Sequence, residues 1–94
     1  MPDQQLHAIV EGHVQGVGFR YFVLEVAQQL RLTGWVRNLD NGNVELVAEG
    51  NRSDLDTLYA AIQSGRPGSL VTNVVGDWLP AENTFTRFSI RPSA

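Results

Sequence analysis

The chain of 94 residues contains no cysteine. This absence excludes disulfide bonds, thiolate nucleophiles and zinc sites that are built on cysteine. The sequence also holds only two histidines, and its carboxylates do not fall in pairs at the spacing of metal ligands. We therefore expect a protein that needs neither a metal nor another cofactor.

The chain also lacks an excess of positive charge and any long apolar run. Seven basic residues stand against ten acidic ones, which gives a formal net charge of -3. Nucleic acids and anionic membranes attract proteins with a basic face, so we expect neither as a partner. No apolar run reaches the roughly 20 residues that cross a bilayer. The first residues lack the basic and apolar regions of a signal peptide, which predicts a cytoplasmic protein.

The size of the chain is typical of one domain. Hydrophobic residues make up 43% of the 94 residues, enough for one modest core. There is no linker, repeat or low-complexity tract. We expect a single domain over residues 1–94, and nothing in the sequence calls for more than a monomer.

The spacing of apolar residues predicts the order of the elements. Alternation along the chain is typical of strands, and recurrence every three to four residues is typical of helices. These patterns predict strands at 5–11, 34–39, 43–49, 70–79 and 85–91 and helices at 19–30 and 53–65. The order predicts an α+β fold, a ferredoxin-like split βαβ sandwich. In it two helices cover one face of a four- to five-stranded, mostly antiparallel sheet.

Particular residues predict where elements turn or end. Asn41 and Gly42 form an Asn-Gly pair, which tolerates the positive φ angles of a hairpin turn. Ser53 is expected to cap the second helix, with Asp56 three residues later in a capping box. Gly65 is expected to end that helix.

Residues 12–20, with the sequence Gly-His-Val-Gln-Gly-Val-Gly-Phe-Arg, are the most informative segment. Glycines allow positive φ angles and a close approach of the backbone to a ligand. The helix that follows directs its free N–H groups and positive dipole end to the same place. The guanidinium of Arg20 offers a planar fork of donors for two oxygens of one anion. Together these features predict a seat for an oxyanion such as phosphate.

Other glycine-rich loops fit the segment less well. A nucleotide-binding P-loop ends in Gly-Lys-Ser/Thr, whereas this loop continues with Phe19, Arg20 and Tyr21. A dinucleotide fingerprint needs a third glycine and a longer, doubly wound sheet. A tight turn without a ligand, with Arg20 in solvent, remains an alternative for the loop taken alone.

A second motif follows on the next predicted strand. Because the first and second strands run in the same direction, the glycine loop and Asn38 are expected at the same edge of the sheet. With both motifs the chain resembles the acylphosphatase family. The family signature Gly-x-Val-Gln-Gly-Val-x-Phe-Arg matches residues 12–20 at every defined position. The second signature matches Gly34, Trp35, Val36, Arg37, Asn38, Gly42, Val44 and Gly50.

This resemblance implies hydrolysis of small-molecule acyl phosphates to a carboxylate and inorganic phosphate, without a metal. It implies that Arg20 binds the phosphate and that Asn38 positions the attacking water. Backbone N–H groups aimed before the reaction would stabilise the charge of a loose phosphoryl transition state. The predicted phosphate-binding residues are Gln15, Gly16, Val17, Gly18, Phe19 and Arg20. No general base is evident, and we hypothesise that a phosphate oxygen of the substrate accepts the proton.

Five other side chains have both a functional and a structural interpretation. His7 and His13 could titrate, but we favour surface histidines. Trp35 and Trp78 could contact the acyl group, but we favour packing on the sheet. Arg37 fits a contribution to the local potential and a solvated strand residue equally well.

One position departs from the family pattern. Similar proteins often have glycine just before the Leu-Thr-Gly-Trp segment, where this chain has Arg31. A left-handed conformation there would strain a non-glycine residue by about 1 kcal/mol.

Two further functions remain as alternatives. A non-catalytic phosphate- or carbamoyl-phosphate-binding module of the same fold would need Arg20 and the loop, but no oriented water, so Asn38 favours the enzyme. A sheet that only contacts protein or RNA is the other alternative. The acidic balance of the chain argues against RNA.

Overall fold

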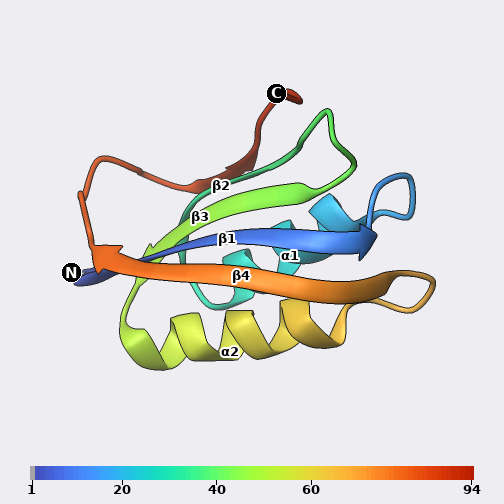
Figure 1. Cartoon of the computed structure of the whole chain (residues 1–94). Helices are drawn as coiled ribbons and strands as arrows, with labels where there is room; N and C mark the ends of the chain where they lie inside the picture. The colour runs from blue at the N-terminus through green and yellow to red at the C-terminus, as the bar shows by residue number, and fades with distance from the viewer. Residues whose placement is uncertain (1) are drawn as a thin grey trace.

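The computed structural model describes residues 2–94, which form five strands and two helices in the predicted order (Figure 1). The elements are β1 (Gln4–His13), α1 (Phe19–Gln29), β2 (Thr33–Asn38), β3 (Val44–Gly50), α2 (Arg52–Ser64), β4 (Leu70–Pro80) and β5 (Phe88–Ile90).

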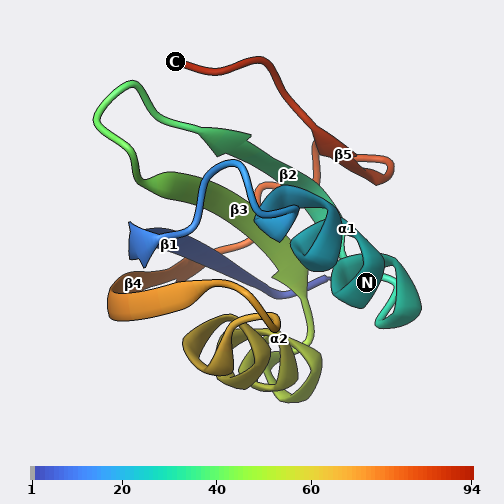
Figure 2. The same ribbon diagram turned by 90° about the vertical axis from the view of Figure 1, so that its right-hand side faces the viewer.

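The strands form one sheet in the order β4-β1-β3-β2-β5. All neighbouring pairs are antiparallel except β2 and β5, which run parallel. Both helices lie on one face of the sheet, which leaves the other face open (Figure 2). The predicted ferredoxin-like α+β fold is confirmed.

The core lies between the helices and the covered face of the sheet. Alternate residues of β1 and β3 face each other there, with Leu6 opposite Ala48 and Val10 opposite Val44. Each helix adds one apolar stripe at helical spacing. The fully buried helical residues are Phe19, Val23, Ala27, Leu55, Leu58 and Ile62. The core therefore follows the strand and helix periodicities of the sequence.

The predicted cap of α2 is wrong. Asn51, not Ser53, is the N-cap: it has an extended backbone, and its side chain accepts a hydrogen bond of 2.8 Å from the N–H of Asp54. Asparagine caps a helix as well as serine does, so the cap lies two residues earlier than predicted. Gly65 ends the helix as predicted, with φ 73°.

The β2–β3 hairpin is closed by a turn that differs in detail from the predicted one. The N–H of Gly42 donates to the carbonyl of Leu39 at 3.1 Å. Gly42 has φ 96°, but Asn41 is not in the positive-φ region. The turn thus needs one glycine rather than a left-handed Asn-Gly pair. The side chain of Asn41 instead accepts a hydrogen bond from the N–H of Asn43 at 3.0 Å.

The last strand is shorter than predicted, because residues 81–87 form a connection without strand structure. Glu49, on β3, lies on the open face of the sheet, yet the residue is only 1% exposed. Its carboxylate accepts hydrogen bonds from the N–H groups of Glu82 at 2.8 Å and Asn83 at 3.0 Å. The side chain of Gln5 also donates to it, at 2.7 Å. These bonds hold the connection between β4 and β5 against the open face of the sheet. The strand β5 begins only at Phe88.

Arg31 adopts the left-handed conformation considered above, with φ 58°. Its N–H donates to the carbonyl of Gln28 at 3.1 Å, and the N–H of Leu32 donates to that of Ala27 at 2.9 Å. This is the Schellman pattern of helix ends, in which glycine is preferred at the position of Arg31.

Replacing Arg31 by glycine is expected to leave the free energy of unfolding unchanged or raise it by up to about 1 kcal/mol, because the strain of the left-handed residue is released. Urea denaturation measures the change. The control Gln28→Gly places glycine at an exposed helical position of α1 and should lower the free energy of unfolding by about 1 kcal/mol. A clearly less stable Arg31→Gly protein would contradict the prediction.

Candidate active site

The loop between β1 and α1 has a backbone of alternating handedness. Gly16 and Gly18 have φ angles of 75° and 78°, whereas Val17 between them is not in the positive-φ region. Such alternation turns successive N–H groups toward one side and forms a concave site for anions. At Gly16 an added Cβ would meet nothing within 4 Å, so the backbone angle rather than crowding favours glycine there.

The N–H groups of this loop are free to bind a ligand. Within residues 2–94, those of residues 15–20 donate to no backbone carbonyl. The N-cap of α1, Gly18, supplies no side-chain hydrogen bond, and the first turn of the helix holds no acidic residue. Neither the cap nor the first turn of α1 therefore neutralises the positive end of the helix dipole.

Gln15 ties the loop to the β2–β3 hairpin. Its Nε2 donates to the carbonyl of Leu39 at 2.7 Å and to that of Asn43 at 2.8 Å. The two segments consequently lie at the same end of the sheet (Figure 2). The sequence motif predicts a role for the backbone N–H of Gln15 alone, and this role of its side chain leaves no signal in the motif.

Asn38 is the last residue of β2, on the face that the helices cover. Its backbone carbonyl accepts a hydrogen bond from the N–H of Ala94 at 3.1 Å. The carbonyl of Ala94 in turn accepts one from the backbone N–H of Asp40 at 2.8 Å. The side-chain Oδ1 of Asn38 is buried and has no hydrogen-bond partner in the described part of the chain. Such an oxygen is unfavourable by about 1–3 kcal/mol unless a partner binds there.

Arg20 lies in the first turn of α1 and is half-buried. Its guanidinium makes no hydrogen bond or ion pair with residues 2–94. The start of α1, which carries Arg20, and the end of β2, which carries Asn38, lie at the same end of the sheet (Figure 1). This agrees with the chain direction, because α1 begins where β1 ends and packs against β2.

A family model described as Acylphosphatase matches residues 6–90. The chain belongs to the acylphosphatase family. An acylphosphatase from Bacillus licheniformis is 49% identical over 86 residues, which cover 92% of this chain and 96% of that protein. The crystal structure of acylphosphatase from Bacillus subtilis superposes with a TM-score of 0.90 at 43% identity, and the match covers 94% of this chain and 98% of that one.

A larger protein contains a similar region. The crystal structure of full-length HypF in the phosphate- and nucleotide-bound form matches with a TM-score of 0.86 at 30% identity. The match covers 99% of this chain but 12% of that one. The acylphosphatase fold thus occurs both in proteins of about this length and as a part of a much longer chain.

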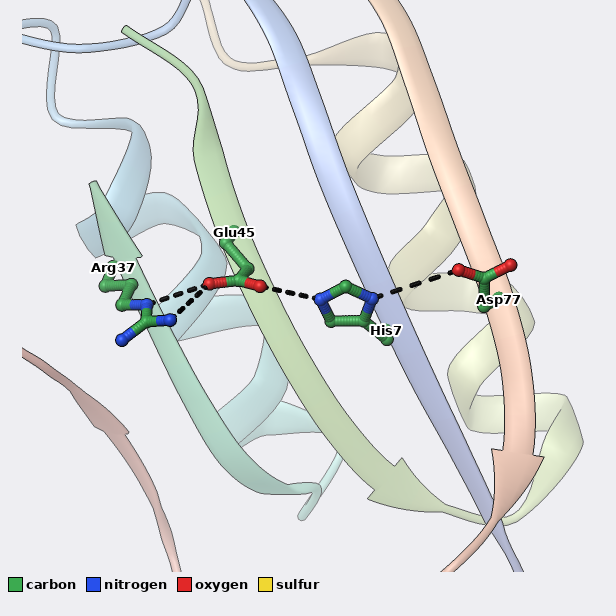
Figure 3. Close-up of polar contacts among 4 residues, drawn as sticks. All are labelled: His7, Arg37, Glu45 and Asp77. Carbon is green, nitrogen blue, oxygen red and sulfur yellow. Dashed lines mark hydrogen bonds and ion pairs between the residues drawn. The ribbon is translucent and has the colours of Figure 1, made fainter. Parts of the chain in front are cut away.

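Two residues considered as functional candidates lie in an ionic network on the open face of this acylphosphatase-family sheet (Figure 3). Arg37 donates to Oε1 of Glu45 through Nε at 2.8 Å and through Nη2 at 2.7 Å. His7 lies between two carboxylates, with Nε2 2.7 Å from Glu45 and Nδ1 4.0 Å from Asp77. Because the network faces away from the helices, Arg37 is better explained as an ion-paired strand residue than as part of the site.

The tryptophans also have structural roles. The guanidinium carbons of Arg37 and Arg91 lie 4.8 Å and 4.9 Å from the ring centroid of Trp35. Arg52 covers the ring of Trp78 at 3.6 Å. Trp35 lies on the open face of the sheet, whereas Trp78 lies opposite Leu6 on the helix-covered face and packs against the core. Both tryptophans thus make cation–π contacts, which agrees with packing rather than with contact to a substrate.

Residues 2–94 contain neither a cluster of potential metal ligands nor a helix that could span a membrane. Histidine, aspartate and glutamate form no group of three or more that could hold a metal ion there. In the same residues, no helix is both long enough and apolar enough to span a bilayer.

The first prediction for this site concerns Gln15. Gln15→Ala is expected to lower the free energy of unfolding by about 2 kcal/mol, because two part-buried hydrogen bonds to the hairpin are lost at about 1 kcal/mol each. Thermal unfolding measures the effect. The control Gln63→Ala changes an exposed glutamine of α2 and should stay within about 0.5 kcal/mol of the parent. Equal stability of the two variants would show that the Gln15 bridge is not formed.

The second prediction concerns the pKa of Glu45. Burial raises this pKa, but hydrogen bonds and charge from His7 and Arg37 outweigh burial and lower it below the ordinary value of 4.5. The unfolded chain therefore binds a proton more readily than the folded one, and Glu45 contributes stability that is fully present above about pH 4.5 and lost as the pH falls through the folded pKa.

Glu45→Gln should therefore make stability less dependent on pH below 4.5 while lowering it at neutral pH. Denaturation curves at a series of acidic pH values measure this slope. The control Asp56→Asn removes an exposed carboxylate that pairs with Arg52 and should leave the slope unchanged. A Glu45→Gln profile parallel to that of the parent would contradict the assignment.

Proposed function

We propose that this acylphosphatase-family chain hydrolyses acyl phosphates to a carboxylate and inorganic phosphate, with residues 15–20 as the seat of the phosphoryl group. Family membership supports the activity. The site residues are supported above all by the run of N–H groups over residues 15–20 that donate to no backbone carbonyl of residues 2–94, at a helix start without a side-chain cap.

The seat would act by electrostatic stabilisation. The transferred phosphoryl group passes through a loose transition state whose charge spreads over three oxygens. N–H groups of Gly16, Val17, Gly18 and Phe19 that are aimed before the reaction stabilise this charge without reorganisation. The guanidinium of Arg20, which has no partner among residues 2–94, would pair with two of the oxygens.

Asn38 would position the attacking water. A water that donates to Oδ1 of Asn38 would satisfy the buried oxygen that has no partner in the described residues. Holding water in line with the departing acyl oxygen converts a bimolecular encounter into an oriented one. Water attacks phosphorus and the bond from phosphorus to the acyl oxygen breaks, so that the carboxylate leaves. Because a carboxylate is a good leaving group, the water needs no strong base, and a phosphate oxygen of the substrate can accept its proton. No metal takes part in this scheme.

We also propose that the protein acts as a monomer in the cytoplasm. All residues assigned to the seat and to the water come from one chain, so no second copy is needed to complete the site. A chain without cysteine gains nothing from an oxidising compartment.

The residue roles predict two different kinetic defects. With benzoyl phosphate in the presence of a chelator, the parent should turn over, while Arg20→Ala and Asn38→Ala should each lose about 100-fold or more in rate. Arg20→Ala should also weaken inhibition by inorganic phosphate, because it removes a phosphate ligand. Asn38→Ala should leave this inhibition unchanged, because it removes only the group that holds water.

The matched controls are Arg87→Ala and Asn73→Ala, which change exposed residues outside the site and should keep the parental rate. Full rates in both Arg20→Ala and Asn38→Ala would refute the residue assignment. A parent that binds phosphate but never releases it from benzoyl phosphate would favour the non-catalytic phosphate- or carbamoyl-phosphate-binding module.

A further inference from the structure

Arg66, far from the two motifs in sequence, contacts the glycine loop. It lies in the connection between α2 and β4, at the end of the sheet where the loop also lies (Figure 1). Its Nη1 donates a hydrogen bond to the carbonyl of Val17, across 49 positions of the chain. A Cβ added at Gly18 would be 3.4 Å from the same Nη1. The guanidinium therefore lies directly against the Val17–Gly18 peptide.

This contact determines the direction of the Gly18 N–H. Residues 2–94 contain no cis peptide bond, and in a trans peptide the carbonyl and the N–H point to opposite sides. Since Arg66 holds the Val17 carbonyl on one side, the Gly18 N–H faces the other side, away from the guanidinium. This N–H is one of those that donate to no backbone carbonyl in the described residues.

Arg66 is itself held in a tight turn. Its backbone carbonyl accepts hydrogen bonds from the N–H of Ser69 at 3.0 Å and from Oγ of Ser69 at 2.7 Å. Gly65 before it has φ 73°, and a Cβ there would come within 2.7 Å of that Oγ. The backbone from which the Arg66 side chain extends is therefore fixed.

The charge of Arg66 is not neutralised nearby. Among residues 2–94 no carboxylate lies within ion-pair distance of its guanidinium. Glu25 lines the same hollow of about 360 Å³ beside Gly18, but it forms no ion pair with Arg66. A full positive charge thus adjoins the peptide whose N–H faces away from it.

We propose that Arg66 is a positioning residue of the phosphate seat. It orients the Val17–Gly18 peptide so that the Gly18 N–H is presented to the anion, and its charge polarises this peptide so that the N–H becomes a stronger donor. The inference rests on the proposed function only in placing the phosphate at residues 15–20. Because its Nη1 is used by the Val17 carbonyl, Arg66 acts through Gly18 rather than as a catalytic residue.

The test compares Arg66→Met, which keeps the length of the side chain but removes its charge and donors, with Arg66→Lys, which keeps a charge and a donor. Arg87→Met is the control, because it removes an exposed arginine outside the site. Inorganic phosphate is titrated into each protein by calorimetry, and the Gly18 amide is followed by NMR. The kcat and KM for benzoyl phosphate and the melting temperature are measured in parallel.

Arg66→Met should weaken phosphate binding about tenfold, and the shift of the Gly18 amide on phosphate addition should shrink. The kcat/KM should fall by at least the same factor. Arg66→Lys should recover part of the affinity and remain within about threefold of the parent. Arg87→Met should match the parent in every measurement.

Three results would overturn the proposal. One is a lower melting temperature of Arg66→Met together with a phosphate affinity and a Gly18 amide shift that equal those of the parent at temperatures where the variant is folded. Arg66 would then have a structural role alone. Another is an equal loss of affinity in Arg87→Met, since that is a general effect of charge. If Arg66→Met does not fold, Arg66→Lys decides, and a loss of affinity of more than about tenfold in this variant counts against the proposal.

The outcome for the proposed function can be read separately. A parent that binds phosphate with a Gly18 response but does not hydrolyse benzoyl phosphate would refute the hydrolase and leave the role of Arg66 supported by the titration. A parent whose loop amides do not respond to phosphate would refute both.

Discussion

The site depends on the two hydrogen bonds from the side chain of Gln15. They join a loop that follows β1 to the hairpin that follows β2, at 2.7 Å and 2.8 Å, and so bring the two motifs of the sequence together. Without this bridge, the loop and Asn38 would be related only through the sheet. A glutamine fits because its amide nitrogen offers two donors, one for each hairpin carbonyl.

The region of the same loop has a positive electrostatic potential, although the protein as a whole is acidic. The chain carries a formal net charge of -3, yet the start of α1 has no acidic residue and no side-chain cap. Arg20 and Arg66 stand near this helix start, and neither is paired with a carboxylate in the described residues. The ion-paired arginine on β2, by contrast, lies on the opposite face. The chain thus concentrates unneutralised positive charge where an oxyanion would sit.

Much of this arrangement could be predicted from local patterns. Periodicity identified the core, the two motifs identified the family, and chain direction placed Asn38 at the end of the sheet with the loop. The left-handed Arg31 was also foreseeable. Contacts of polar side chains across many residues were not, because they leave no periodic signal: the bond from Arg66 to the loop is an example. The prediction of the α2 cap was wrong for a different reason, since Asn51 and Ser53 are equally good caps and sequence alone does not rank them.

We propose that the glycine loop and Arg20 bind one tetrahedral anion with Asn38 beside it. A crystal structure of the protein with inorganic phosphate tests this most directly. We predict that the anion accepts hydrogen bonds from N–H groups within residues 15–20 and from the Arg20 guanidinium, with the Asn38 side chain facing it across one water. Phosphate bound only elsewhere, or an Asn38 side chain turned away from the bound anion, would contradict the account.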